Sequence, residues 1–332
     1  MSGPVVVEVT RGPLVESRHE GIAAVVKADG TVMAAWGEVD APIYPRSANK
    51  PIQAMAFVES GAVERFGLGD EHISLACASH NGEPRHVATV RGWLKTIGLG
   101  EDDLECGMQP PKLPSNVEAL AREGVRPTAA YNNCSGKHSG FLSTAVVNGE
   151  PTRGYIKYDH PVQRRLRDVM SDLCGSNANE FGYGIDGCGI PTLATPLRSL
   201  ARAMASMADP ARLSNRHAEA ATRIRSAISA EPFMMAGTGR FCTRVNGALP
   251  GVVQIKSGAE GLCCGMLPTL GLGVALKMWD GAGRAAEVAM AMILSHLGVL
   301  PAERREEILA HPVRNVVGLL GGEMRPAKSW LG

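Results

Sequence analysis

Strand-like segments lie near both ends of this 332-residue chain, and the long middle has a helical pattern. Near the N-terminus, Asp29-Gly30 separates two such segments, which is a strong hairpin signal. The expected strands are Val5–Val9, Gly21–Lys27, Thr31–Trp36, Val252–Lys256, Cys264–Leu267 and Gly273–Trp279. Because strands from both ends of a chain can pair in one sheet, this order predicts a mainly antiparallel sheet flanked by helices, with a helical lobe inserted in the middle.

Between these strands, apolar residues recur at helical spacing and are bounded by helix start and stop signals. A first helix is expected to follow Ser47 and to run to about Glu59, and the short apolar run Ile73–Ser79 is expected to be a strand. Further helices are expected over Pro84–Ile97, Pro161–Leu173, Thr195–Ala208, Asn215–Ala230 and Ala285–Leu297. The predicted fold class is α/β (α+β), in one domain over residues 1–332. Its sheet subdomain would cover about 1–45 and 240–332, and its helical lobe about 84–232.

The composition is that of an ordinary globular protein, with 45% apolar and 20% charged residues. The formal charge is +1 and no concentrated basic run occurs, so neither nucleic acid nor a membrane surface is an expected partner. The first residues, Met1–Glu8, have no pattern of a secretory signal, and no apolar window is long enough to span a membrane. We therefore expect a cytoplasmic protein whose eight cysteines are reduced thiols, metal ligands or redox groups and do not form a disulfide framework.

Ser47 lies three residues before Lys50, at the start of the first expected helix. Residues with this spacing share a helix face, so the lysine amine could take the proton of the serine hydroxyl as it attacks a carbonyl carbon. Pro51 is compatible with the first turn of a helix, where its missing N–H would have no partner. Taken alone, however, the motif favours a capping serine followed by a surface lysine.

Two later motifs favour a catalytic Ser47–Lys50 pair over a helix cap. Lys256-Ser257-Gly258 closes an expected strand and resembles the Lys-Thr-Gly element of penicillin-recognising serine enzymes. In such an element the lysine supplies positive charge, and a glycine at the position of Gly258 lets substrate lie flat against the strand edge. Ser79-His80-Asn81 adds a second hydroxyl beside the amide of Asn81, and the three motifs occur in the chain order of that superfamily. A strand end and a polar loop remain the alternatives for the two later motifs.

Two glycine-rich stretches, Tyr131–Gly140 and Tyr183–Pro191, read as loops that gather binding groups. Asp186 in the second stretch could bind a substrate ammonium group. Cys134 and Cys188 could hold zinc, with Lys137 or His138 nearby, although the spacing matches no standard zinc pattern. Two reduced, partly buried thiols are the plainer interpretation.

As a set, the motifs of the chain resemble those of the bacterial L-asparaginase II family of the Rhizobium type. The matching stretches are Val9–Gly12 with Glu16–His19, Pro45–Ser47 with Lys50–Gln53, Cys77–His80, Asn133–His138, Asp186–Gly189, Ala236–Cys242 and Lys256–Gly261. The resemblance implies a fold similar to serine β-lactamases and glutaminases, hydrolysis of L-asparagine to L-aspartate and ammonia, and a homodimer. One departure is Cys106-Gly107-Met108, where the resemblance leads us to expect a histidine after the glycine.

The resemblance also implies two Ser–Lys pairs, Ser47 with Lys50 and Ser79 with Lys256, and a zinc ion held by Cys134, Lys137 and Cys188 for substrate positioning. Our sequence hypothesis makes Ser47 the nucleophile and Lys50 its general base, with Ser79 and Lys256 relaying protons. The substrate would be bound by Asp186, His138, Asn81 and Gly258. The alternatives are a β-lactam or D-amino-peptide hydrolase, and a non-catalytic zinc- or ligand-binding protein.

Overall fold

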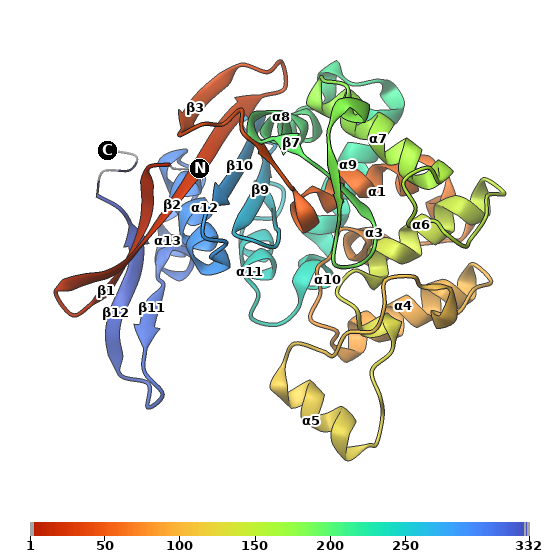
Figure 1. Ribbon diagram of the computed structural model, residues 1–332, viewed down its shortest axis with the longest axis horizontal. Helices are drawn as coiled ribbons and strands as arrows, with labels where there is room; N and C mark the ends of the chain where they lie inside the picture. The colour runs from red at the N-terminus through yellow and green to blue at the C-terminus, as the bar shows by residue number, and fades with distance from the viewer. Residues whose placement is uncertain (1–2, 329, 331–332) are drawn as a thin grey trace.

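The computed structural model describes residues 3–328 and 330. Its centre is an eight-stranded antiparallel sheet built from both ends of the chain (Figure 1), in the order β11-β12-β1-β2-β10-β9-β8, with β3 also paired to β2. The strands are β1 (Val5–Arg11), β2 (Leu14–Lys27), β3 (Val32–Trp36), β8 (Gln254–Ser257), β9 (Leu262–Leu267), β10 (Leu272–Met278), β11 (Pro312–Arg314) and β12 (Leu320–Pro326). The expected joining of N-terminal and C-terminal strands in one antiparallel sheet is confirmed.

The middle of the chain forms a helical region on one side of this sheet (Figure 1). Its α-helices are α1 (Lys50–Glu59), α2 (Ala62–Arg65), α3 (Asp70–Ala76), α4 (Pro84–Thr96), α5 (Pro114–Arg122), α6 (Ser135–Val147), α7 (Pro161–Cys174), α8 (Leu197–Ala208), α9 (Asn215–Ala230), α10 (Pro232–Ala236) and α11 (Phe241–Ala248). The 3-10 turns are η1 (Arg46–Asn49), η2 (Glu101–Asp103), η3 (Ala129–Tyr131), η4 (Ala178–Glu180) and η5 (Pro210–Arg212). Two small sheets pair β4 (Pro42–Ile43) with β7 (Thr195–Pro196), and β5 (Tyr183–Ile185) with β6 (Pro191–Leu193).

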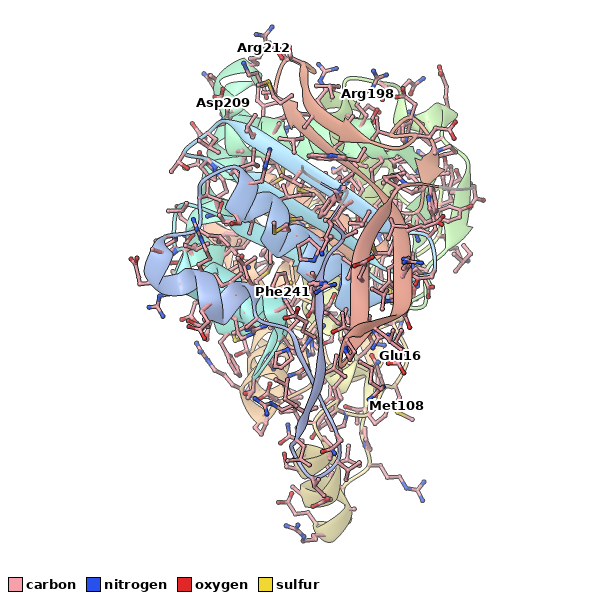
Figure 2. The ribbon with its side chains drawn as sticks, turned by 90° about the vertical axis from the view of Figure 1, so that its left-hand side faces the viewer. Glu16, Met108, Arg198, Asp209, Arg212 and Phe241 are labelled. Atoms are coloured by element: carbon pink, nitrogen blue, oxygen red, sulfur yellow. The ribbon has the colours of Figure 1, made fainter. Side chains whose placement is uncertain are left out.

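Helices cover both faces of the main sheet. On the face turned to the viewer in Figure 2, α12 (Gly283–His296) lies across the strands, and α13 (Ala302–Leu309) lies beside it. On the other face α8 packs against β10, where Gly273 permits a close approach. A Cβ atom on Gly273 would stand 2.1 Å from the carbonyl oxygen of Ala201, so any larger residue would push α8 off the sheet. The helical region is thereby held close to the sheet.

Two sequence expectations are wrong. The run Ile73–Ser79 is not a strand: Asp70–Ala76 forms helix α3, with Asp70 and Glu71 in its first turn. Only its second half, Ile73–Ala76, is buried throughout, and periodicity cannot distinguish so short a buried run from a strand. The stretch Tyr131–Gly140 is not an open loop either, because its second half forms the buried beginning of α6.

Candidate active site

Ser47 lies in the short turn η1, which leads directly into α1. Pro51 stands in the first turn of α1, as expected. Arg46, just before the serine, has a φ of 49°, a left-handed conformation that costs a non-glycine residue of the order of 1–3 kcal/mol. The Ser47 residue is half-buried, whereas Lys50 is fully buried. The strained backbone therefore presents the serine at the surface of the turn while the lysine points into the protein.

Ser79 stands between two buried lysine amines. The Nζ atom of Lys50 donates to Ser79 Oγ at 3.0 Å, and the Nζ atom of Lys256 reaches the same oxygen at 2.9 Å. Lys50 also donates to the carbonyl of Ala78. Thus the structure brings Ser79 and Lys256 together. The backbone N–H of Lys50 donates to the carbonyl of Ser47. No side-chain hydrogen bond joins the two residues in the described part of the chain, and the Lys50 amine is instead directed to the second serine.

Burial is the largest influence on Lys256 and lowers the pKa of its ammonium group to about 7. The positive charges of Lys50 and Arg240 lower the pKa further, whereas Cys242 and Cys134 act in the opposite direction. An ordinary lysine has a pKa near 10.4, so an amine at about 7 is neutral in roughly half of the molecules at neutral pH. Lys256 can therefore act as a proton acceptor.

The end of β8 touches the turn that carries Ser47. A Cβ atom on Gly258 would stand 3.0 Å from the carbonyl oxygen of Pro45 and 3.1 Å from the amide nitrogen of Ala48. Within residues 3–328 and 330, no acceptor faces the backbone N–H of Ser47 or of Ala259. Two unpaired N–H groups on adjoining segments next to a serine can stabilise an oxyanion.

The backbone of Ser79 is fixed by the segment that ends α10. Its N–H donates to the carbonyl of Met235 at 3.0 Å, and the N–H of Asn81 donates to that of Ala236, also at 3.0 Å. The Asn81 side-chain amide donates to Glu83 and to the carbonyl of Thr238, each at 3.1 Å. Asn81, expected to bind substrate, thus ties together the loops around Ser79.

Cys134, Lys137 and Cys188 converge, as the resemblance implies. The Nζ atom of Lys137 donates to Cys188 Sγ at 3.0 Å, and Lys50 donates to Cys134 Sγ at 3.1 Å. A hydrogen bond from the Cys134 thiol is the main cause that lowers the pKa of Cys188 to about 5, and Lys137 adds to it. The Cys188 thiolate and the Lys137 ammonium therefore form a buried ion pair. Lys50 thus contacts Cys134 as well as Ser79.

The three side chains fit a zinc ion in their chemistry. Thiolates and a deprotonated amine are zinc ligands, and in a tetrahedral site the sulfur and nitrogen atoms would be about 3.6 Å apart. Lys137 and Cys188 would have to separate by only about half an ångström from their present 3.0 Å, and Lys137 would have to lose a proton. Among the residues that the structure describes, no three His, Cys, Asp or Glu side chains form a metal site. A zinc site at this place would therefore depend on Lys137.

Asp186 lies beside this cluster, where its Oδ1 atom accepts from Arg46 Nε at 2.8 Å and from the N–H of Gly187 at 2.6 Å. Although burial opposes ionisation, Lys137 and Arg46 lower the pKa of the carboxyl group below its usual value. His138 is fully buried, and a hydrogen bond of 2.8 Å joins its Nδ1 to the hydroxyl of Tyr155. Its Nε2 has no partner in the described residues. Asp186 thus keeps one oxygen for a ligand, whereas His138 supports the cluster from inside.

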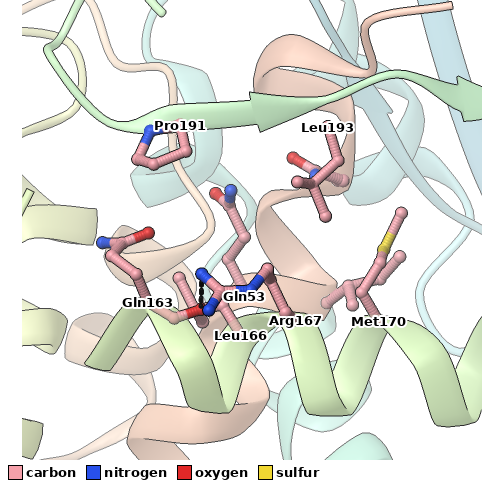
Figure 3. A pocket seen from close by; sticks show the side chains of 9 residues that line it. Gln53, Gln163, Leu166, Arg167, Met170, Pro191 and Leu193 are labelled. Carbon is pink, nitrogen blue, oxygen red and sulfur yellow. Dashed lines mark hydrogen bonds between the residues drawn. The ribbon is translucent and has the colours of Figure 1, made fainter. Parts of the chain in front are cut away.

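A separate cavity lies under the Ser47 turn, between α1, α7 and β6 (Figure 3). The side-chain oxygens of Asn49 and Gln53 line it and have no hydrogen-bond partner among residues 3–328 and 330. Its volume of about 30 Å³ has room for one or two waters, which would satisfy both oxygens. An amino acid cannot fit, so this cavity is not a substrate pocket.

A comparison with models of protein families identifies one family that matches this chain. The model of the L-asparaginase II family matches residues 7–326, which is nearly the whole chain. The chain belongs to the L-asparaginase II family. The L-asparaginase II family is one of hydrolases of amide bonds, and the residues expected from the resemblance all lie within the matched range. No curated protein sequence matches the chain.

Several solved structures are similar to this L-asparaginase II chain at low identity. A structure of Mglu in its native form is 14% identical, with a TM-score of 0.47, and the match covers 85% of this chain and 66% of that one. A β-lactamase from Mycobacterium bovis is 16% identical, with a TM-score of 0.40 and coverage of 83% and 94%. An octameric penicillin-binding protein homologue from Pyrococcus abyssi is 16% identical, with a TM-score of 0.42 and coverage of 83% and 73%. The chain spans slightly less than two thirds of the Mglu chain.

The site also contains residues that sequence reasoning did not single out. Arg240 donates to Asn81 Oδ1 at 3.0 Å and to the carbonyl of Ser79 at 3.4 Å. The N–H of Lys112 donates to the carbonyl of Asn81 at 2.8 Å. Arg240 lies within the Ala236–Cys242 stretch, yet nothing in the sequence connects it to Ser79.

None of the described helices is long and apolar enough to cross a membrane.

Proposed function

We propose that this chain hydrolyses L-asparagine to L-aspartate and ammonia through a serine ester intermediate. The observation that carries the proposal is the contact of two buried lysine amines with the single oxygen Ser79 Oγ, at 3.0 and 2.9 Å. Two cations cannot both remain charged at this separation without a large cost, so one of the amines is favoured to be neutral. A neutral buried amine next to a hydroxyl is what a serine hydrolase needs to remove a proton.

Ser47 is proposed as the nucleophile because it is the more exposed of the two serines. Its oxygen would attack the side-chain amide carbon of asparagine, and its proton would pass to Lys50. Lys50 would give a proton to Ser79 Oγ while the Ser79 hydroxyl proton moves to neutral Lys256. The N–H groups of Ser47 and Ala259 would hold the negative oxygen of the tetrahedral intermediate.

In the second half of the reaction the proton returns from Lys256, through Ser79, to the amide nitrogen. The carbon–nitrogen bond then breaks, ammonia leaves, and a β-aspartyl ester on Ser47 remains. A water molecule, deprotonated by the same lysines, attacks the ester carbon. The bond from that carbon to Ser47 Oγ then breaks, the proton passes from the lysines to the serine oxygen, and aspartate leaves. Proton transfer by positioned groups of this kind contributes typically 10²–10⁴-fold to a rate.

Asp186 is proposed to accept the α-ammonium group of the substrate with the oxygen that is not bonded to Arg46. Cys134, Lys137 and Cys188 would hold a zinc ion, which would supply a fixed positive charge for substrate positioning. His138 and Asn81 would act by fixing their neighbours, since their contacts are made inside the protein. The homodimer and the cytoplasmic location stay predictions.

The test compares ammonia release from L-asparagine and L-glutamine, and cleavage of the β-lactam nitrocefin. We expect asparagine turnover in the wild type, and complete loss in Ser47→Ala with an unchanged circular dichroism spectrum. Acid-quenched wild-type enzyme should carry an adduct of the mass of an aspartyl group, and Ser47→Ala should not. Nitrocefin cleavage without ammonia release would favour the β-lactam hydrolase, and normal turnover by Ser47→Ala would remove the proposed nucleophile.

A further inference from the structure

Two buried histidines follow Ser79 in the chain and take no part in the proposed mechanism. His80 and His86 are both fully buried, and their rings are stacked with centroids 4.8 Å apart and planes 12° from parallel. The ring of Phe233 is stacked on that of His86 in the same way, with centroids 4.8 Å apart. A continuous stack of three rings therefore links the segment after Ser79 to α10.

The hydrogen bonds around His80 assign its tautomer. The hydroxyl of Ser135 donates to the carbonyl of Ala130 at 2.9 Å, so its oxygen accepts from His80 Nε2, which lies 2.9 Å away. The ring proton of His80 is therefore on Nε2, and the unprotonated Nδ1 accepts from the N–H of Gly82 at 3.0 Å. Burial is the largest of the causes that hold the pKa of His80 well below its usual value, so the ring stays neutral.

The second ring is oriented by hydrogen bonds of its own. His86 Nδ1 accepts from the N–H of Glu83 at 3.3 Å, and His86 Nε2 donates to the carbonyl of Phe233, also at 3.3 Å. Burial, the largest cause, lowers the pKa of His86 as well. Because this neutral ring cannot turn without breaking both bonds, it gives the ring of His80 a fixed surface to pack against.

His80 joins the loop of Ser79 to the segment that begins α6. Its N–H donates to the carbonyl of Asn133 at 3.2 Å, and its ring bonds to Ser135, the first residue of α6. The neighbouring N–H groups, those of Ser79 and Asn81, donate instead to carbonyl groups of α10. The loop is thus tied to α10 on one side and, through His80, to α6 on the other.

The position of Ser79 Oγ tolerates little displacement. The oxygen lies 3.0 Å from Lys50 Nζ and 2.9 Å from Lys256 Nζ, and a side-chain hydrogen bond is lost beyond about 3.5 Å. A shift of Ser79 by roughly 0.5 Å away from either amine would therefore interrupt a proton relay that passes through its hydroxyl. Misplacement of a reacting group by about 1 Å can cost about 100-fold in rate.

We propose that His80 is a positioning residue, which through its hydrogen bond to Ser135 keeps Ser79 Oγ within reach of both lysine amines. The inference rests on the proposed function, in which Ser79 relays protons between Lys50 and Lys256. His80 does not touch the substrate in this scheme. Its loss therefore slows the chemical steps and leaves the binding of asparagine unchanged.

The test removes the His80–Ser135 hydrogen bond from either side. His80→Asn keeps an acceptor for the N–H of Gly82, as in an Asx turn, but its amide is too short to reach Ser135. Ser135→Ala removes the acceptor and leaves His80 in place. Each variant should lower kcat for ammonia release from L-asparagine about 10–100-fold, with KM within about twofold of the wild type. Because both remove the same bond, the double variant should lose no more than the worse single variant.

Two further variants serve as controls. Ser135→Thr keeps the hydroxyl and should restore most of the kcat that Ser135→Ala loses. His72→Asn is the matched control, since His72 Nδ1 also accepts from a backbone N–H, that of Gly69 at 3.1 Å, and this variant should keep the wild-type kcat. Circular dichroism and urea unfolding give the folded fraction of each variant, to which kcat is referred. If His80→Asn does not fold, the contrast between Ser135→Ala and Ser135→Thr decides.

A normal kcat in Ser135→Ala, or a rise in KM as large as the fall in kcat, would overturn the inference while asparagine hydrolysis stands. So would losses that multiply in the double variant, since they would show that His80 and Ser135 act independently. If the wild type releases no ammonia from asparagine at all, the proposed function fails, and this inference fails with it.

Discussion

The lowered pKa of Lys256 predicts a steep pH dependence of the reaction. Burial and the neighbouring charges of Lys50 and Arg240 bring this pKa to about 7. The neutral, proton-accepting fraction is then roughly 10% at pH 6, 50% at pH 7 and 90% at pH 8. With an ordinary pKa near 10.4, only about 0.04% would be neutral at pH 7, so the environment of Lys256 raises the reactive fraction about 1,000-fold.

If neutral Lys256 is needed, kcat/KM for L-asparagine should rise about ninefold from pH 6 to pH 8, following one titration near pH 7. The assay is a coupled measurement of ammonia across this range, at constant ionic strength and with buffers overlapped at each change. Lys256→Arg carries a permanent charge in the same place, so it should lose about 1,000-fold at pH 7 and show no rise near pH 7. The ¹³C resonance of the Lys256 side chain, assigned by its disappearance in Lys256→Met, should titrate in the wild type at the same pH.

A flat pH profile of kcat/KM between pH 6 and 8, together with a Lys256 resonance that titrates above pH 9, would refute the argument that burial lowers the pKa of this amine. A profile with the expected rise that persists in Lys256→Met would show that another group is responsible. The matched control is Lys95→Met, at an exposed lysine of α4, which should keep the wild-type profile.

Three further perturbations probe the surroundings of the site. Gly258→Val adds side-chain atoms at a position where even a Cβ would stand 3.0 Å from the carbonyl oxygen of Pro45. Turnover should therefore fall at least 100-fold in the ammonia assay, and urea unfolding should show a stability loss of about 1–3 kcal/mol. Activity near normal would contradict this. Cys188→Ser should weaken zinc binding at least tenfold in equilibrium dialysis, with Cys174→Ser as the control. Hydrogen bonds that His217 donates to the carboxylates of Glu59 and Asp172 raise its pKa to about 9. Its stabilising contribution is therefore complete below about pH 6.5 and lost as the pH rises through 9. The urea midpoint should therefore fall between pH 7 and 9.5 in the wild type and change less in His217→Gln.

The fold could be predicted from sequence wherever a local signal was strong. The Asp29-Gly30 turn and the apolar segments on either side of it predict the hairpin of β2 and β3. Helix α9 begins and ends at the expected residues, Asn215 and Ala230. Helix α3 was missed because its second half, Ile73–Ala76, is buried throughout, and a short buried run cannot be distinguished from a strand by periodicity. The buried start of α6 was missed because its small polar residues are typical of loops.

The contacts among the proposed site residues could not be predicted from the sequence. Sequence spacing brought Lys50 toward Ser47, since residues three apart share a helix face. In the structure Lys50 reaches Ser79 and Cys134, which come from other elements, so its partners depend on packing that spacing does not encode. Arg240 and Lys112 were missed for the same reason, because backbone approach at Gly82 and Gly237 brings them to the loop.

The burial that lowers the pKa of Lys256 should also lower the free energy of unfolding, which can be measured. With a pKa of about 7 in the folded state and about 10.4 in the unfolded state, folding at pH 7 loses on the order of 4 kcal/mol in protonation free energy. Methionine has a similar length and no charge, so Lys256→Met should raise the free energy of unfolding by about 1–4 kcal/mol while turnover is lost. The gain should shrink as the pH is raised toward 10, since the unfolded lysine then loses its proton as well. A Lys256→Met protein less stable than the wild type at pH 7 would show that the contacts of the amine with Ser79 and Ser257 outweigh the cost of its burial.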